Sequence, residues 1–237
     1  MQSISMQLSD LYYNALVGAL SYFSKVPLYG EEYLPEKGPA IFAANHLSEK
    51  GPLRFIFSVN RRVHPWVISE MTNFQQSPDY LRKDFVEPVM HLRPPVSNAV
   101  SYAITRISVP LMKSLQPVPV YRRNTYGTLN DTMLQSHILL DNSRYLLIFP
   151  EDPDSNIVDE ASGIKHFMKG YVRLAEQLYE EKKHVLSFYP VAILETGVHI
   201  GKPVQFDPDN SDRSKGLERT RIAQTLENEV IRLYHLH

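Results

Sequence analysis

The sequence predicts an α/β fold with a largely parallel central sheet flanked by helices. Short apolar runs alternate along the chain with longer segments of helical periodicity, which is the order of a strand–helix–strand fold. The runs are continuously apolar rather than alternating, as is typical of strands buried on both faces of a parallel sheet. Polar residues follow several of the runs, where the strand ends of such a sheet place their functional groups.

The first element is an apolar N-terminal helix, predicted over residues 1–25. Its apolar residues recur at spacings of three and four from Leu8 to Phe23, and most of its sides are apolar. Such a helix either packs in a core or lies on a membrane surface, so we expect possible peripheral membrane contact through residues 8–24. The uncharged run Leu11 to Ser24 is shorter than the roughly 20 residues needed to cross a bilayer.

The remaining elements form one α/β core over residues 26–237, so residues 1–237 are predicted to be a single domain. Residues 72–96 carry four prolines and are the least regular part. Pro110 is expected to kink or split the helix that contains it. The strands are predicted at 39–44, 63–68, 118–121, 145–149, 188–194 and 204–206, and the helices at 52–60, 99–115, 126–140, 164–178 and 222–233.

Composition excludes several classes of function. The chain of 237 residues has a formal net charge of -1, and no basic stripe predicts binding to nucleic acid. It contains no cysteine, which excludes disulfides, thiolate nucleophiles and cysteine-bound zinc. No basic n-region precedes an apolar segment, so we expect a cytoplasmic protein, peripheral on the inner face of the membrane if it contacts lipid.

Three predicted strand ends carry polar groups. Asn45-His46, Tyr121-Arg122-Arg123 and Glu151-Asp152 each follow an apolar run. Because ligands collect beyond the carboxyl ends of parallel strands, these segments are expected to build one site.

Six blocks in this order carry a family resemblance. The blocks are Gly30-Glu31 to Ala44-Asn45-His46, Pro117 to Arg122, Phe149-Pro150-Glu151, Phe167-x-Lys169-Gly170 with Arg173-Leu174-Ala175, Tyr189 to Ile193, and Ile200 to Val204. Together they resemble the glycerolipid acyltransferases of the lysophosphatidic acid and glycerol-3-phosphate type, which move a fatty acyl group from a thioester to a lipid hydroxyl. The resemblance implies a glycerolphosphate-acyltransferase-like fold and a role in phospholipid metabolism.

Two of the family's motifs are altered. The His-x4-Asp motif begins at His46 but has Gly51 where the family has aspartate, although Pro52 still follows. The Phe-Pro-Glu-Gly-Thr-Arg motif becomes Phe149-Pro150-Glu151 followed by Asp152-Pro153-Asp154. The residues that help to hold an acceptor phosphate in the family are therefore replaced by a sequence with two acids.

The resemblance assigns His46 as the general base, a task that suits imidazole because its pKa lies near working pH. Glu49 or Glu151 is the candidate to orient it in place of the missing aspartate, and Glu151 also positions the acceptor. Arg122 and Arg123 are candidate phosphate ligands. Asn45, Phe149, Pro150, Asp152 and Lys169 complete the expected substrate-binding set.

The implied donor is acyl-CoA or acyl carrier protein, and the implied acceptor is lipid-like, with a hydroxyl or an amine. A thioester is already activated, so no cofactor and no metal is expected. An acidic loop formed by Asp152, Asp154, Asp159 and Glu160 would repel phosphate if it lies at the site, which favours a neutral or cationic acceptor. The alternative is a solvated loop.

Two other functions stay open. Gly51 and the altered third block fit a catalytically impaired lipid- or acyl-binding protein on the same scaffold. Hydrolysis of a thioester by His46 and water is a more distant option.

Overall fold

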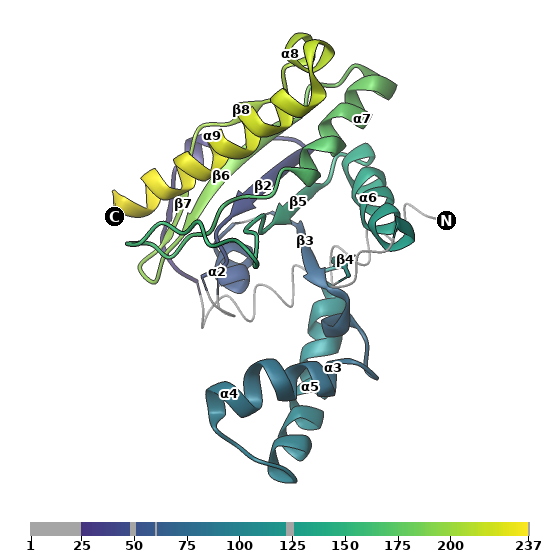
Figure 1. The fold of residues 1–237 in the computed structure, drawn as a ribbon, viewed down its shortest axis with the longest axis vertical. Coiled ribbons are helices and arrows are strands. Elements are labelled where there is room, and N and C mark those ends of the chain that lie inside the picture. Colours follow the sequence, from purple (N-terminus) through teal and green to yellow (C-terminus); the bar gives the residue numbers. More distant parts are fainter. Residues whose placement is uncertain (1–24, 48–50, 60, 122–125, 237) are drawn as a thin grey trace. The chain divides into compact units, whose positions relative to one another are not determined.

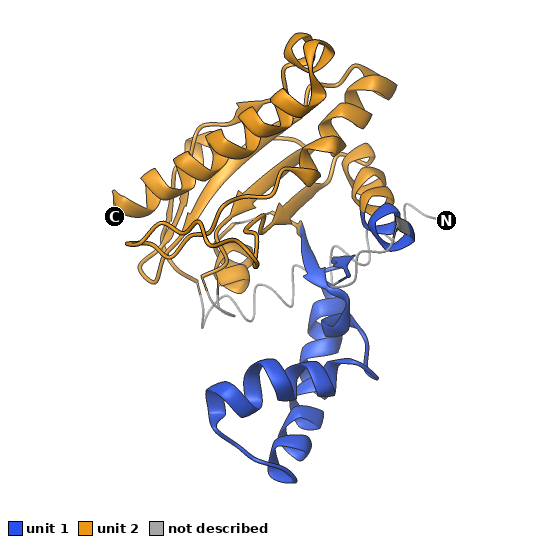
Figure 2. Cartoon of the chain, in the orientation of Figure 1, with its two compact units in different colours: residues 1–13, 64–132 blue, residues 14–63, 133–237 orange. Residues whose placement is uncertain are grey.

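The computed structural model describes residues 25–47, 51–59, 61–121 and 126–236 (Figure 1). The predicted N-terminal helix lies outside the described residues. The chain divides into two compact units, coloured separately in Figure 2. Among the described residues, unit 1 contains 64–132 and unit 2 contains 25–63 and 133–236. The prediction of one domain over 1–237 stays a prediction, and each unit is described by itself.

Unit 2 is built on a mostly parallel sheet (Figure 1). Its strands follow the order β1-β7-β6-β2-β5, and β8 also pairs with β6. β2 runs parallel to both β5 and β6, and β1 runs parallel to β7. β7 and β8 are antiparallel to β6. The strands are β1 (Leu28–Tyr29), β2 (Ala40–Ala44), β5 (Tyr145–Ile148), β6 (Ser187–Ile193), β7 (Val198–Ile200) and β8 (Val204–Gln205).

The sheet of unit 2 is buried on both faces, as its continuous apolar strands predict. Neighbouring residues of a strand point to opposite faces. Tyr189 contacts Phe42, whose ring lies 5.2 Å from that of Phe55 in helix α2. Phe188 contacts Tyr171 on the other face, with ring centroids 5.9 Å apart. The prediction of an α/β fold with a largely parallel sheet flanked by helices is therefore confirmed.

The helices of unit 2 lie close to the predicted places, with one correction. Residues 164–178 are not one long helix. Helix α7 begins only at Arg173, after a 3-10 turn at Gly170–Val172, and residues 164–168 return along residues 150–158 instead. The helices are α2 (Gly51–Ser58), α7 (Arg173–Lys182), α8 (Pro208–Arg213) and α9 (Lys215–His235), with a 3-10 turn at Glu31–Tyr33. Helix α6 (Tyr126–Asp141) crosses the boundary between the units.

Unit 1 consists of two parallel strands and a set of helices. β3 (Val63–Ile68), whose first residue belongs to unit 2, pairs with β4 (Val118–Val120). The proline-rich segment is more regular than predicted and forms short helical turns, and α5 continues through Pro110 instead of splitting there. The helical elements are a 3-10 turn (Ser69–Thr72), α3 (Ser77–Leu81), a π-helical turn (Arg82–Val86), α4 (Glu87–Met90) and α5 (Val96–Ser114).

Within the described ranges, no helix has both the length and the apolar character needed to cross a membrane.

Candidate active site

His46 lies directly beyond the carboxyl end of β2. The five residues of β2 are fully buried, whereas His46 two positions later is exposed. Its ring meets the ring of Phe149 edge to face, with centroids 4.9 Å apart and planes at 73°. Phe149 follows β5, the parallel neighbour of β2. The first and third blocks of the sequence therefore meet in space, as the strand-end argument predicts.

Asn45 fixes the backbone that carries His46. Its side-chain amide donates to the carbonyl oxygen of Ile193 at 3.0 Å and accepts from the Ile193 N–H at 2.7 Å. Asn45 is only 3% exposed, so these bonds join the ends of β2 and β6 in a place sheltered from water. The predicted substrate ligand is thus engaged with backbone, and it positions the loop that begins at His46.

Glu151 connects the same loop to β5 and to the segment that follows. One carboxylate oxygen accepts from the backbone N–H of His46 at 2.6 Å. The other accepts from the backbone N–H of Lys165 at 3.0 Å. Both bonds are charge-assisted and therefore stronger than bonds between neutral groups. Glu151 thus holds the main chain of His46, and the hydrogen bonds of the described residues give its carboxylate no contact with the imidazole ring.

Residues 151–167, here called the acidic hairpin, fold back on themselves beyond β5. Backbone bridges join Glu151 to Phe167 and Val158 to Lys165. Asp152 accepts from the N–H of Asp154 at 3.0 Å, which closes a tight turn.

Asp159 caps a second turn of the acidic hairpin through the N–H and hydroxyl of Ser162, at 2.9 and 2.6 Å. The bonds from Ser162, aided by the nearby His235, lower the pKa of the Asp159 carboxyl. Asp152 and Asp159 therefore serve the turns of the hairpin, whereas Asp154 and Glu160 are exposed.

Helix α9 supports the acidic hairpin through residues that sequence reasoning did not select. Glu227 accepts from the backbone N–H of Phe167 at 2.8 Å and lies 2.8 Å from Nδ1 of His166. His235 reaches Asp159 at 3.0 Å. A carboxylate and a histidine on one face of a C-terminal helix give no signal of this contact, because the hairpin lies about 60 residues earlier.

Gly51 begins helix α2 beside His46. A Cβ atom placed on Gly51 would lie 3.3 Å from the Cβ of Leu47 and 3.4 Å from the carbonyl carbon of His46. These contacts are close, so an added side chain needs a shift of a few tenths of an ångström. A side chain at position 51 would therefore start next to the residue whose ring an aspartate orients in the family.

Arg54 is a further positioning residue that the sequence did not single out. It lies one turn after Gly51 in α2, and its guanidinium donates to the carbonyl oxygen of Leu194 at 3.0 Å and pairs with Glu195. It thereby joins α2 to the segment that follows β6. Asn45 and Arg54 therefore link the end of β2 and the first turns of α2 to the end of β6 and the residue after it.

The remaining predicted residues take varied places. Pro150 is buried, and its carbonyl oxygen accepts from the N–H of Met168 at 2.8 Å. Lys169 is exposed and donates to the hydroxyl of Thr220 in α9 at 3.1 Å. Glu49, Arg122 and Arg123 lie outside the described residues, and their roles stay predictions.

A hollow on unit 2 is separate from this group. Its volume is about 690 Å³, and residues from β1, β7 and α9 line it, among them Tyr29, Lys202 and Arg232. His46, Phe149 and Glu151 are not part of that lining. The predicted site residues His46, Phe149 and Glu151 lie instead at the carboxyl ends of β2 and β5, where His46 is exposed.

The geometry offers one accessible imidazole, that of His46, whose backbone and ring both have partners. Its backbone is held by Glu151, its loop by Asn45, and its ring by the edge of Phe149. An exposed imidazole held in this way is suited to accept a proton from a bound hydroxyl or amine.

The chain was compared with family models, curated proteins and solved structures. No family model and no curated protein matches the chain. Among solved structures, the chain is similar to the 1-acyl-sn-glycerophosphate (LPA) acyltransferase PlsC from Thermotoga maritima. The sequence identity is 15%, the TM-score is 0.46, and the match covers 96% of this chain and 79% of that chain. A likeness at this level assigns no activity.

Proposed function

We propose that this protein is an acyltransferase that moves a fatty acyl group from a thioester donor, acyl-CoA or acyl carrier protein, to the hydroxyl or amine of a lipid-like acceptor. The proposal rests on the motif resemblance together with one observation. The backbone N–H of His46 is bound by Glu151 from 105 residues further along the chain, at 2.6 Å. This contact joins the first and third motif blocks, which supports a site that both share.

The proposed reaction moves one proton from the acceptor to the leaving thiolate by way of His46, and it needs no cofactor. The acceptor oxygen or nitrogen attacks the thioester carbonyl carbon while His46 takes the proton from the attacking atom. Collapse of the tetrahedral intermediate breaks the carbon–sulfur bond, and the leaving thiolate takes the proton from the imidazolium. The products are the acylated acceptor and the free thiol of the carrier.

The acidic hairpin favours an acceptor without a free phosphate near it. Asp154 and Glu160 are exposed there, and Glu151 at its base binds His46. Carboxylates near the acceptor repel a phosphate and attract an amine. We therefore expect neutral or amine-bearing acceptors to be better substrates than glycerol phosphate or lysophosphatidate.

The second candidate is a lipid- or acyl-binding protein that does not catalyse transfer. The observation that favours it is the glycine at position 51, because the orienting carboxylate of the family is absent there. Loss of an orienting carboxylate from a serine-protease triad lowers turnover by about four orders of magnitude. A similar loss here would leave binding without useful turnover.

A transfer assay separates the two candidates. Purified protein is incubated with labelled acyl-CoA or acyl carrier protein and a panel of acceptors, and the acylated product is counted. We expect His46→Ala to abolish transfer, while His184→Ala, which removes an exposed histidine beyond α7, leaves it unchanged. Transfer that persists in the His46 variant refutes the proposed base, and thioester binding without turnover in the wild type supports the second candidate.

The Gly51→Asp variant tests the orientation of the imidazole. The new side chain starts 3.4 Å from the carbonyl carbon of His46, so we expect an increase in kcat of about tenfold or more if the rest of the site is competent. Gly51→Asn is the matched control, since it has the same shape without the charge. An equal gain in both variants would contradict an electrostatic role for the carboxylate.

A further inference from the structure

Helix α5 of unit 1 has its polar and apolar faces reversed. The residues buried against the rest of unit 1 are Ser97, Ser101, Thr105 and Val109, at a spacing of four. Such a spacing marks one face of a helix. Most surface helices bury an apolar stripe and expose a polar one.

Two of the small hydroxyl residues on the inner face of α5 are hydrogen-bonded within the helix. Ser101 and Thr105 donate to the carbonyl oxygens of Ser97 and Ser101, both at 2.8 Å. Thr105 also lies 3.4 Å from the hydroxyl of Ser77 in α3. The inner face of α5 therefore consists mainly of hydroxyl residues, with Val109 at its end, and several apolar residues of the helix are left on the outside.

The outer face of α5 is a continuous apolar stripe. Ile107 is 74% exposed, Tyr102 is 63% exposed and Val96 is 53% exposed. At 100° per residue, Val96, Ala99, Ala103 and Ile107 fall within one sector of the helix, opposite the hydroxyl face. Ala99 and Ala103 are also exposed.

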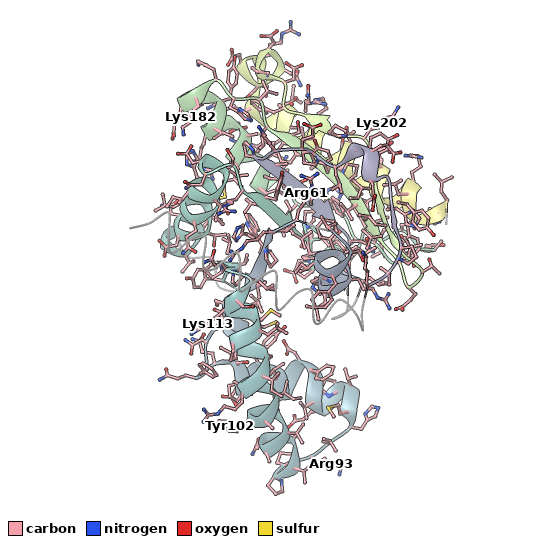
Figure 3. The ribbon with its side chains drawn as sticks, turned by 180° about the vertical axis from the view of Figure 1, so that it is seen from behind. Arg61, Arg93, Tyr102, Lys113, Lys182 and Lys202 are labelled. Carbon is pink, nitrogen blue, oxygen red and sulfur yellow. The ribbon has the colours of Figure 1, made fainter. Side chains whose placement is uncertain are left out.

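The charges on this face have one sign. Arg106 and Lys113 are exposed and lie at the edge of the apolar stripe, and Tyr102 and Lys113 project from the same side of α5 (Figure 3). The ammonium of Lys113 lies 5.4 Å from the ring centroid of Phe74, which is also exposed.

The sequence around α5 also carries charges of one sign only. Residues 88–130 contain no aspartate or glutamate but include Arg93, Arg106, Lys113, Arg122 and Arg123, in a chain whose net charge is -1. The segment that contains α5 therefore carries cations without neutralising acids.

We propose that the outer face of α5 docks on the surface of an anionic phospholipid bilayer. A helix that presents apolar and aromatic residues beside Lys and Arg lies in the interface, with its cations at the anionic headgroups. The tyrosine ring suits this depth because one end is apolar and the other polar. The 19 residues of α5 give a contact line of about 28 Å.

The charge pattern selects this partner over two others. A second copy of the chain would bring Arg106 and Lys113 against the same cations, because a two-fold contact pairs a face with itself. A nucleic acid would match the cations but not the stripe of valine, alanine and isoleucine beside them. An anionic bilayer matches both the charge and the apolar surface.

The test is vesicle flotation of the full-length protein, measured without any thioester. We expect binding to vesicles of phosphatidylcholine with about one third phosphatidylglycerol, and much weaker binding to phosphatidylcholine alone. Ile107→Ser with Tyr102→Ser should reduce the partition coefficient about tenfold or more. The matched control is Leu134→Ser with Ile138→Ser on α6, which removes two residues that are 60% and 50% exposed and should leave binding within about twofold.

A second pair of variants tests the charges. Arg106→Gln with Lys113→Gln should weaken binding about tenfold to thirtyfold, since each cation near an anionic surface contributes comparably. Arg173→Gln with Lys202→Gln removes the same two charges from exposed positions of unit 2 and should have little effect. Circular dichroism and thermal melting check that each variant is folded.

The proposal is overturned if the wild type does not float with anionic vesicles, or if the α5 variants bind as the wild type does. It is also overturned if the control variants lose as much binding as the α5 variants. Concentration-dependent dimerisation without lipid, abolished by the Ile107 and Tyr102 changes, would assign the face to a second copy instead. Acyl transfer is not part of any of these measurements, so a failure of the proposed function would leave the result unchanged.

Discussion

Glu151→Gln is the most informative single change, because it keeps the shape of the side chain while altering its bonding. The carboxylate accepts one backbone N–H on each oxygen, from His46 at 2.6 Å and from Lys165 at 3.0 Å. A glutamine has one carbonyl oxygen that accepts and one amino group that only donates. It can satisfy one of the two amides, and its amino group then faces the other.

The magnitude follows from the lost bond. A hydrogen bond to a charged group contributes about 1.5–3 kcal/mol. Glu151 is half-buried and His46 is exposed, so water replaces part of the interaction and we expect a net loss of about 1–2 kcal/mol. This corresponds to about fivefold to thirtyfold faster opening of the contact.

Hydrogen exchange measures this loss at the two amides concerned. We expect faster exchange at the backbone N–H of His46, of Lys165, or of both in Glu151→Gln, and a lower transfer rate because the imidazole is less well placed. The matched control is Glu160→Gln, an exposed carboxylate in the same acidic hairpin, which should exchange as the wild type does. Unchanged protection at both amides in Glu151→Gln would refute the role of Glu151 as the link between the strand ends.

Three further predictions concern stability. Asn45→Ala leaves the buried N–H and carbonyl of Ile193 without partners, so we expect a loss of about 2–4 kcal/mol in urea unfolding; a loss below about 0.5 kcal/mol would contradict the structural role. Glu218 is fully buried, which by itself raises the pKa of its carboxyl, but the hydrogen bonds that it accepts outweigh burial and lower that pKa. Glu218→Gln should therefore lower the free energy of unfolding by about 1–3 kcal/mol at pH 7. Because a lowered carboxyl pKa stabilises above the unfolded value, near 4.5 for Glu218, this cost should shrink as the pH falls below it; a gap independent of pH would contradict the assignment. The pKa of Asp159 is lowered too, so amide protection in the acidic hairpin should fall in acid, and Asp159→Asn should remove that pH dependence.

The main strands were predictable from sequence, because a short continuous apolar run is typical of a strand that is buried on both faces of a sheet. β2, β5 and β6 lie within a residue or so of the predicted bounds. The antiparallel strand β7 was not predicted, since Val198–Ile200 is too short for any periodicity to show. The polar helix α8 was not predicted either, because its stability comes from Asp207 as a cap and from its contact with Glu218.

Two helices show why periodicity alone misleads. Ile164 and Phe167 have helical spacing relative to Leu174 and are buried, yet they belong to the acidic hairpin. Their burial comes from the return of that hairpin, and the helix starts only after Gly170. In α5 the same period correctly predicts a helix, but the apolar residues face outward because serine and threonine allow the closer packing inside. A spacing pattern specifies a face of a helix but not which way that face points.

The candidate site was predictable in position but not in bonding. Sequence reasoning placed Asn45, His46 and Glu151 at neighbouring strand ends, and the structure brings them together. It expected side chains that contact substrate, whereas Asn45 and Glu151 contact backbone. The difference arises because a loop that leaves a parallel sheet has unpaired N–H and carbonyl groups, which need partners once they are sheltered from water.

This division of roles sharpens what the altered motifs mean. The chain retains the motif residues Asn45 and Glu151. Both bind main chain, and together they position the backbone of His46. The residues it lacks, the aspartate at position 51 and the Gly-Thr-Arg after Glu151, are those that act on the imidazole or on a phosphate in the resembled family. The backbone of His46 is thus held in place while the carboxylate that orients its ring in the family is absent. This combination gives a specific prediction for Gly51→Asp. If Asn45 and Glu151 position His46 correctly for catalysis, the aspartate should raise kcat with little change in KM, because it acts on the base and not on binding. If Gly51→Asp shows no transfer although the His46 N–H still binds Glu151, the protein serves binding only. The acyltransferase function proposed for the wild type is then refuted.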